Sequence, residues 1–277
     1  MEQLKIKTPA KINLGLNIIG KRPDGFHNIE TFFYPVKLYD YLTFRSSKSF
    51  KFNCNVESLK KDQNNSTIKA KKLLEETIKK KFNFTIDLQK NIPIGAGMGG
   101  GSSDGAAALL AINKFFKLNL SKQKLKELAL KIGSDVPFFI DPKPGFAISR
   151  GEVIQNFKFK VPYPILIINP GIHISTKWAY QNILPGKPRY HLFNLPLIQS
   201  DNFKILKNLV FNDFEEPVFK KYPEIRNIKE SLYDLGAIFA LMTGSGSTVF
   251  GIFKDIEHAV KAERKYSRNY FTFLHEP

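Results

Sequence analysis

The sequence predicts an α+β protein with two domains, an N-terminal one at residues 1–158 and a C-terminal one at residues 159–277. Three observations support this class. Strand-like segments dominate the start of the chain, helical periodicity begins at Asn65, and a helix–strand–loop–strand–helix–strand order follows residue 222. Separate runs of strands and helices are typical of α+β proteins. With 277 residues, of which 43% are hydrophobic, the chain can form two modest cores.

The first segments are predicted strands because they are rich in β-branched and aromatic residues and are separated by turn signals such as KRPDG at 21–25. These segments are residues 4–7, 11–19, 29–36, 40–46 and 51–55. After Asn65, the residues Ala70, Leu73, Leu74 and Ile78 fall on one helical face and predict a helix.

Residues 82–88 alternate as a strand and lead into a glycine-rich loop, and residues 102–116 read as a helix. Ser121 is the predicted N-cap of the next helix. Short strands are predicted at 145–150 and 152–157.

The second domain begins with a buried strand at 164–169. Pro223 opens a helix that Gly236 closes, and Asp255 caps another helix. Strands are predicted at 237–242, 247–253 and 269–274, while residues 185–222 carry no clear pattern.

Composition narrows the class of protein. The single cysteine, Cys54, is most simply a small, partly buried residue in a reducing compartment. The N-terminal segment lacks the apolar core of a signal peptide, and no apolar run approaches the ~18 residues of a membrane span. We therefore expect a cytoplasmic protein with no membrane partner. Its oligomeric state is left open between a monomer and a weak homodimer.

The net charge of +17 permits anionic partners, including nucleic acid. The lysines are scattered, however, and most fit solvated helix faces. Because the chain has no RNA-recognition, zinc-finger or homeodomain signature, we expect no nucleic-acid partner, and keep such binding as the alternative from another class.

The glycine-rich loop is the strongest local signal. Six of the seven residues from Gly95 to Gly101 are Gly or Ala. The segment Gly95–Gly100 matches G-x-G-x-x-G, but the second strand and acidic residue of a dinucleotide fold do not follow, and no Lys completes a P-loop. A tight turn would explain two or three of the glycines. Free backbone N–H groups at a helix N-terminus predict a nucleotide-phosphate site, where Ser102 and Ser103 either cap the helix or bind phosphate or a metal ion.

Two charged residues stand in apolar surroundings. Lys11 lies between Ala10 and Ile12 in a predicted strand, where it either meets an anion or extends to solvent from an edge strand. Asp135 lies between a helix end and an apolar cluster, where it is either a carboxylate with a tuned pKa or a cap or turn residue.

Taken together, the motifs resemble the GHMP kinase superfamily. The pattern PxxxGxGGGSSxxAA at 93–107 resembles its phosphate loop, and LMTGSGSTVFGIF at 241–253 resembles its C-terminal glycine motif. PAKINLGL, RPDGFHNIET, GSDVPFF and NPGIHISTKWAY resemble the branch that acts on 4-diphosphocytidyl-2-C-methyl-D-erythritol. The matches are collinear from Thr8 to Phe253.

The resemblance implies a left-handed β-α-β N-terminal domain, like that of some ribosomal proteins, and a ferredoxin-like C-terminal domain. It also implies transfer of the ATP γ-phosphate, with Mg²⁺, to the 2-hydroxyl of the cytidyl substrate in the non-mevalonate route to isopentenyl diphosphate. By resemblance, Asp135 is the general base and Lys11 stabilises charge beside it. A carboxylate can take the hydroxyl proton, and Lys11 would keep that carboxylate ionised.

The resemblance also implies two groups of binding residues. ATP is expected to contact Pro93, Gly95, Ala96, Gly97, Met98, Gly99, Gly100, Gly101, Ser102 and Ser103, with Asn65 near its base. The cytidyl substrate is expected to contact Asn13, Phe26, His27, Thr176, Tyr180, Gly244, Ser245 and Gly246.

Within the second group, Phe26 and Tyr180 would sandwich the cytosine and His27 would hydrogen-bond its edge. Ordinary core packing for the two aromatic residues, and a turn position for His27, remain the structural alternatives.

Three departures and alternatives complete the prediction. Gly105 stands where Ala is usual in the superfamily. No strong carboxylate ligand for Mg²⁺ is evident, so Ser103 is a weak candidate and ATP and water would hold most of the metal. The nearest rival is a related kinase for homoserine or mevalonate, against which the cytidine-type motifs argue.

Overall fold

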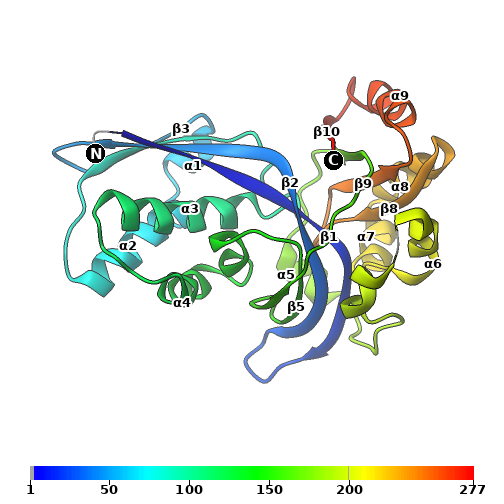
Figure 1. The fold of residues 1–277 in the computed structure, drawn as a ribbon, viewed down its shortest axis with the longest axis horizontal. Helices are drawn as coiled ribbons and strands as arrows, with labels where there is room; N and C mark the ends of the chain where they lie inside the picture. Colours follow the sequence, from blue (N-terminus) through cyan, green and yellow to red (C-terminus); the bar gives the residue numbers. More distant parts are fainter. Residues whose placement is uncertain (1–2, 199) are drawn as a thin grey trace. The chain divides into compact units, whose positions relative to one another are not determined.

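The computed structural model describes residues 3–198 and 200–277 (Figure 1). Contacts divide the chain into two compact units. Unit 1 contains the described residues up to Ala10, Lys37–Ile94 and Gly99–Pro142, and unit 2 contains Lys11–Val36, Gly95–Met98 and Lys143–Pro277. The units alternate along the chain because two long strands contribute to both. The domains predicted at 1–158 and 159–277 stay a prediction.

The long strands are β1 (Gln3–Lys21) and β2 (His27–Ser46), which pair with each other. The sequence predicts two strands in each of these regions, and the breaks between them are wrong. Polar residues in the two gaps explain the error. Thr8 interrupts the hydrophobic pattern of β1 although it is 1% exposed, and Lys37 interrupts that of β2 as an exposed residue between two buried neighbours.

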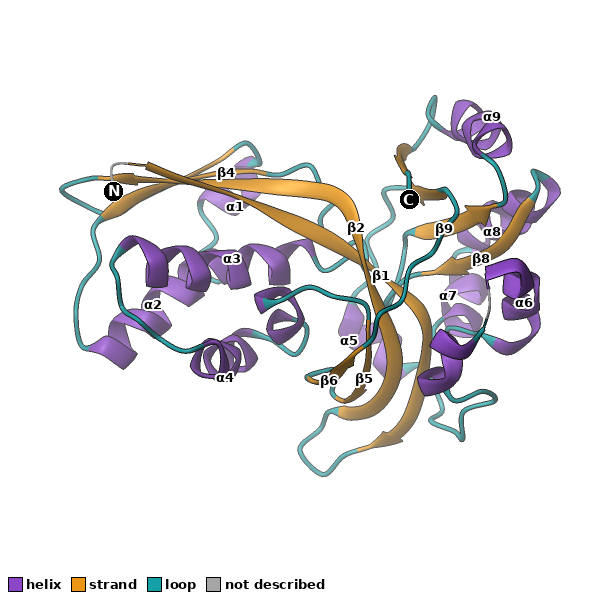
Figure 2. Cartoon of the chain, in the orientation of Figure 1, coloured by secondary structure: helices purple, strands orange, loops and turns teal. Residues whose placement is uncertain are grey.

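In unit 1, β4 (Phe84–Gln89) pairs antiparallel with the later part of β2 and parallel with β3 (Lys51–Cys54). Three helices that contact one another lie on one side of these strands: α2 (Ser66–Ile78), α3 (Gly100–Phe115) and α4 (Lys122–Ile132) (Figure 2). The shorter elements are α1 (Glu57–Lys60) and the 3₁₀ helix η1 (Val136–Ile140).

Local capping explains where two of these helices begin. The Asn65 side chain accepts a hydrogen bond from Thr67 N–H, and the Ser121 side chain accepts one from Lys124 N–H, which satisfies N–H groups that lack partners within the helix. The cap that we predict at Ser121 is confirmed.

In unit 2, β5 (Gly145–Ser149) pairs with the first part of β2 and with β6 (Val153–Asn156). A second sheet contains β7 (Ile165–Asn169), β8 (Ala237–Met242), β9 (Val249–Phe253) and β10 (Phe271–His275). Its order is β10-β7-β9-β8, and all neighbours are antiparallel. This order, with helices between β7 and β8 and between β9 and β10, is the ferredoxin-like arrangement.

Two amphipathic helices pack on this sheet, α8 (Pro223–Asp234) and α9 (Ile256–Tyr266). Their inner residues, including Ile228 and Ala262, join one core with Ile168 of β7 and Met242 of β8. The predicted helix start at Pro223, the end at Gly236 and the cap at Asp255 are all confirmed.

The region that gives no clear sequence pattern, 185–222, forms short helical pieces. They are η2 (Leu192–Leu197), η3 (Ser200–Ile205), α6 (Leu206–Leu209) and α7 (Glu215–Lys221). None is long enough to display a helical period over several turns, which explains why periodicity missed them. The α5 helix (Thr176–Gln181), capped by Ser175, was missed for the same reason.

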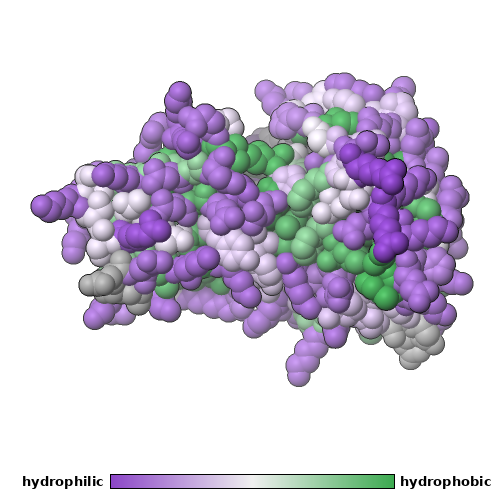
Figure 3. Space-filling model, turned by 90° about the horizontal axis from the view of Figure 1, so that it is seen from above, coloured by the Kyte–Doolittle hydropathy of each residue, from purple (hydrophilic) through white to green (hydrophobic). Residues whose placement is uncertain are grey.

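The face of the molecule seen from above is largely polar (Figure 3). Hydrophilic residues cover most of the face that Figure 3 shows, in line with the scattered lysines of the sequence. Cys54 is buried, and burial raises the pKa of its thiol. No helix in the two described ranges combines the length and hydrophobicity that a bilayer crossing requires.

Candidate active site

The glycine-rich loop continues directly into the start of α3. Gly99 has a left-handed φ of 70° and precedes the first helical residue, Gly100, so α3 begins two residues before the predicted start. No side chain caps this end. The cap predicted from Ser102 or Ser103 is therefore wrong, and the N–H groups of the first turn are left for another acceptor.

Ser103 is a second polar group at the start of α3. Its side chain is 1% exposed, and within the described part of the chain its Oγ has no hydrogen-bond partner. A buried hydroxyl without a partner is unfavourable in a folded protein. Its position in the first turns of α3 suits an oxygen ligand of a phosphate-bound ion or a donor to phosphate.

The other part of the loop, Gly95–Met98, lies in unit 2. Gly97 has a φ of 77°, and a Cβ there would overlap the carbonyl oxygen of Thr243. Conversely, a Cβ on Gly244 would lie 2.8 Å from Gly97 O and 3.0 Å from Gly97 Cα. The two glycine motifs therefore pack backbone against backbone, which only glycine permits at this separation.

The side chain of Lys11 also contacts the loop at Gly97. Its Nζ donates hydrogen bonds to Gly97 O at 2.9 Å and to Asn13 Oδ1 at 2.6 Å, and its backbone N–H donates to Met98 O. The residue is only 3% exposed, so the alternative of an edge-strand Lys reaching solvent is wrong. Its buried ammonium adds positive charge beside the loop.

Asn13 connects this part of the site. Its Nδ2 donates to Thr31 Oγ1 at 2.8 Å, and its Oδ1 accepts from Thr243 Oγ1 at 3.0 Å. Asn212 Nδ2 donates to Met242 O and Gly244 O and thereby holds the second glycine motif. Sequence reasoning missed Thr31, Thr243 and Asn212, because no local pattern marks a polar side chain whose partner is distant along the chain.

The residues predicted to bind cytosine make other contacts. The Tyr180 ring stacks on the His27 ring, with centroids 4.7 Å apart and planes at 21°. Phe26 is 47% exposed, and the Arg150 guanidinium lies 4.0 Å from its ring centroid. Arg150, whose Nε has no hydrogen-bond partner in the described ranges, is a further residue that the sequence analysis missed. Burial, and then the charge of Lys21, lower the pKa of His27, so its imidazole is neutral at pH 7.

Other predicted residues have structural places of their own. Thr176 Oγ1 and Ser245 Oγ share a hydrogen bond of 3.2 Å, which brings α5 to the second glycine motif. Asn65 caps α2 with its side chain, and its predicted place near the ATP base stays a prediction. Ala96 and Met98 are buried inside the loop, and Pro93 precedes it.

Asp135 lies in a turn of unit 1 directly before η1, and its side chain makes no capping hydrogen bond to that helix. Lys11 belongs to unit 2. The pairing of these two residues therefore stays a prediction.

Comparison with known proteins defines the class. The profile for the GHMP kinases N terminal domain matches residues 65–141, and the profile for GHMP kinases C terminal matches residues 194–272. A protein of Chlorobium phaeobacteroides named 4-diphosphocytidyl-2-C-methyl-D-erythritol kinase is 40% identical over 273 residues, which cover 95% of this chain and 90% of that protein. One of the same name from Azobacteroides pseudotrichonymphae is 45% identical over 251 residues, or 88% and 91% of the two chains.

Solved structures agree. A crystal structure of 4-(cytidine 5'-diphospho)-2C-methyl-D-erythritol kinase matches with a TM-score of 0.83, 29% identity and 98% coverage of both chains. The homoserine kinase of Cytophaga hutchinsonii shares the fold, with a TM-score of 0.70, 18% identity and coverage of 99% and 94%. The chain therefore belongs to the GHMP kinases, in the family of the 4-diphosphocytidyl-2-C-methyl-D-erythritol kinases. This membership confirms the predicted fold and implies ATP as co-substrate.

Proposed function

We propose that the chain transfers the γ-phosphate of ATP to the 2-hydroxyl of 4-diphosphocytidyl-2-C-methyl-D-erythritol, giving the 2-phosphate and ADP. The observation that carries the proposal is the near full-length similarity to kinases of that name. The contacts around Gly97 support it, because Lys11 and the second glycine motif contact the phosphate loop there and Asn13 holds the Lys11 ammonium.

The proposed reaction is a single displacement at phosphorus. The 2-hydroxyl oxygen forms a bond to the γ-phosphorus while the bond to the β–γ bridging oxygen breaks and ADP leaves. Asp135 takes the hydroxyl proton, since an alcohol is a poor nucleophile until it loses that proton. Lys11 and the N–H groups of the loop stabilise the charge on the transferred group.

Mg²⁺ would accompany ATP and neutralise part of the phosphate charge. Within residues 3–198 and 200–277, no group of three or more His, Cys, Asp or Glu side chains could hold a metal ion. Ser103 is the residue that we propose as a protein ligand, because its buried Oγ lacks a partner among these residues. Magnesium bound to nucleotides keeps water and phosphate oxygens as most of its ligands, which suits this sparse site.

For the cytidyl group, we propose stacking on Phe26 and Tyr180 with the neutral His27 at the base edge. Stacking on an aromatic face contributes ~1–3 kcal/mol per base. The exposed Phe26 ring is open to a ligand on part of its surface, and the His27–Tyr180 stack would have to rearrange for the base to contact Tyr180. Metabolites of this kind are also consistent with the predicted cytoplasmic location.

The test is a coupled assay of ADP release from MgATP. The protein is offered 4-diphosphocytidyl-methylerythritol, methylerythritol 4-phosphate, homoserine and mevalonate in parallel. Turnover with the cytidyl compound alone is the expected result. Turnover with homoserine or mevalonate instead would keep the phosphate loop and contradict the proposed roles of Phe26, His27 and Tyr180.

A further inference from the structure

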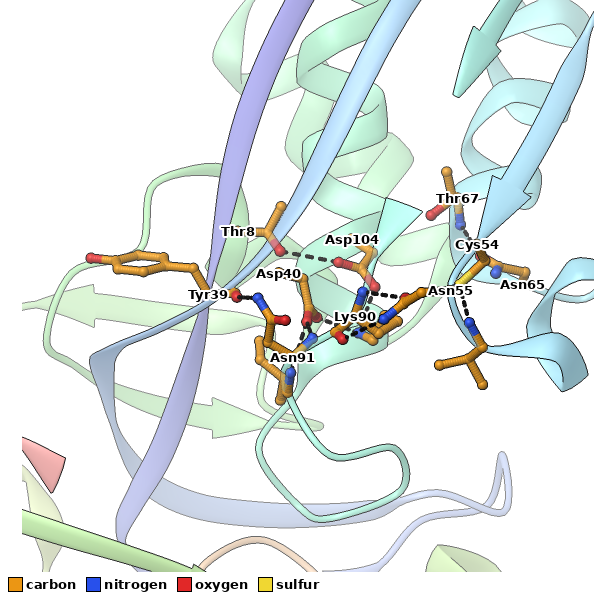
Figure 4. Close-up of polar contacts among 12 residues, drawn as sticks. Thr8, Tyr39, Asp40, Cys54, Asn55, Asn65, Thr67, Lys90, Asn91 and Asp104 are labelled. Atoms are coloured by element: carbon orange, nitrogen blue, oxygen red, sulfur yellow. Dashed lines mark hydrogen bonds and ion pairs between the residues drawn. The ribbon is translucent and has the colours of Figure 1, made fainter. Parts of the chain in front are cut away.

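A cluster of buried polar side chains lies in unit 1 where the phosphate loop joins the fold. The cluster, here called the Lys90 cluster, consists of Thr8, Asp40, Lys90 and Asp104 (Figure 4). Lys90 Nζ pairs with Asp40 Oδ2 and, at 2.7 Å, with Asp104 Oδ2. Asp104 Oδ1 accepts a hydrogen bond of 3.0 Å from Thr8 Oγ1. The three charged side chains are 5% exposed or less.

The backbone of Lys90 and the two residues after it is also fixed. Asn55 Oδ1 accepts from Lys90 N–H at 2.7 Å, and Asn55 Nδ2 donates to Lys90 O at 3.0 Å. Asp40 Oδ1 accepts from the N–H groups of Asn91 and Ile92. These three residues lead into the glycine-rich loop, and we call them the first stem of the loop.

Asp104 belongs to the start of α3, which follows the loop and is its second stem. It lies in α3, four residues after the helix begins at Gly100. A Cβ on Gly100 would lie 3.1 Å from Lys90 Nζ and 3.0 Å from Ile92 Cγ2, so the Lys90 side chain fills the space directly beside the first helical residue. The ammonium therefore joins the chain before the loop to the helix after it.

Charge makes this arrangement costly. Burial lowers the pKa of Lys90, but the two carboxylates outweigh burial and raise it, so the side chain stays charged. Two carboxylates share one ammonium, which leaves an excess negative charge in the interior. Buried ionic groups of this kind stabilise a fold weakly or not at all compared with apolar residues of similar size. The cluster therefore calls for a reason other than stability.

We propose that Lys90 is a positioning residue for the ATP phosphates, and that its bond to Asp104 sets the separation of the two stems of the phosphate loop. The inference rests on the proposed function, since it takes ATP as the ligand of this loop. Backbone N–H groups bind phosphate oxygens well only when their spacing is fixed before the ligand arrives. Lys90 and Asp104 themselves need not touch the nucleotide.

Two substitutions of Asp104 separate the bond from the charge. D104N removes the charge but keeps the hydrogen bond to Lys90, because the Asn oxygen can accept from Lys90 and its amide can donate to Thr8. D104L removes the same charge and also breaks the bond to Lys90, while Lys90 keeps its partner Asp40. Affinity for ATP is measured by titration calorimetry without the second substrate, and folding is checked by circular dichroism and thermal melting.

The expected result is a wild-type affinity for ATP within threefold in D104N and at least a tenfold loss in D104L. A matched control replaces a second buried ion pair of unit 1, Lys71 and Glu75 on α2, by Met and Gln. The Lys71 Nζ and Glu75 Oε1 atoms of this pair are 2.7 Å apart. The control should lose stability and keep its affinity. If D104L does not fold, D104A breaks the same bond to Lys90 with a side chain that fits inside the space of Asp.

Equal losses in D104N and D104L would overturn the proposal in favour of a charge effect. Unchanged affinity in a folded D104L or D104A would also overturn it, as would an equal loss in the control. If the wild-type protein binds no ATP, the proposed function itself fails, and that outcome is distinct from the others.

Discussion

Gly100 and Gly101 are consecutive residues in the first turn of α3, yet protein packing requires only Gly100 to be glycine. A Cβ on Gly100 would meet Ile92 and Lys90 at 3.0–3.2 Å. A Cβ on Gly101 would meet no described atom within 4 Å, and its φ is not left-handed. If Gly101 lies in the phosphate loop as proposed, the close approach of ATP is the reason that we expect for a glycine at this position.

This contrast predicts opposite effects of two alanine substitutions. G100A should lower the free energy of unfolding by about 1–3 kcal/mol through overpacking. G101A should keep or raise stability by up to about 1 kcal/mol, because alanine favours helix over glycine, but it should raise KM for ATP about tenfold. Thermal melts and ATP kinetics on both variants check this. An unchanged KM for ATP in G101A would show that no ATP phosphate approaches that position.

Lys11 should be needed for turnover beyond its structural role. K11M removes the ammonium that donates to Gly97 O and Asn13 Oδ1 and thereby removes positive charge from the loop, so kcat should fall about 10²–10³-fold. Lys7, exposed on the same strand, supplies the matched control K7M, which should behave as wild type. Steady-state kinetics measure kcat for both variants. A K11M enzyme with the wild-type kcat would show that Lys11 has only a structural role.

Asp135 should act in the transition state. D135N should lower kcat by about 10²–10⁴-fold while both substrates still bind, because a general base takes its proton only as the bond to phosphorus forms. D141N, at the end of the same short helix, is the control and should keep kcat within a few-fold. Near-normal turnover of D135N would exclude Asp135 as the base.

Phe26 should contribute to recognition of the base. F26A should raise KM for the cytidyl substrate about tenfold or more and leave KM for ATP unchanged, since loss of a stacking face costs ~1–3 kcal/mol. F193A removes another partly exposed Phe of unit 2 as a control. The sandwich is refuted if F26A and F193A give the same small change.

Asp104 should make stability depend on pH. Burial and the charge of Asp40 raise the pKa of Asp104 from 3.8 to about 6, although Lys90 and Thr8 oppose them. The folded state therefore binds a proton more tightly than the unfolded state, and stability from this group falls as pH rises from about 4 to about 6. Relative to wild type, D104N should gain about 2 kcal/mol of unfolding free energy between pH 4 and pH 7. Denaturant melts at both pH values measure this gain, and a constant difference would contradict the raised pKa.

Much of the fold could be predicted because its signals are local. The caps at Ser121 and Asp255 and the helix from Pro223 to Gly236 follow from residues within a few positions of each element. Such signals survive in a single sequence because the interacting atoms are neighbours in the chain. The ferredoxin-like domain is implied by the family resemblance and not by local signals.

The polar framework of the site could not be found in this way. Lys90 is one of many lysines, and its partners Asp40 and Asp104 are 50 and 14 residues away. Asn212 holds the second glycine motif from 30 and 32 residues away, within a region that lacks any period. Nothing close to these residues in the sequence marks them, since each acquires its partner only through the tertiary fold.

The contact between Gly97 and Gly244 has a consequence for how this sequence can evolve. A Cβ on Gly244 would overlap the backbone of Gly97, and a Cβ on Gly97 would overlap the backbone carbonyl oxygen of Thr243. A mutation at either glycine cannot be rescued by a substitution in the opposite motif, because the atoms in the way belong to the backbone, which every residue has. As long as a descendant keeps this backbone contact, both codons are held under purifying selection together, although they lie far apart in the gene.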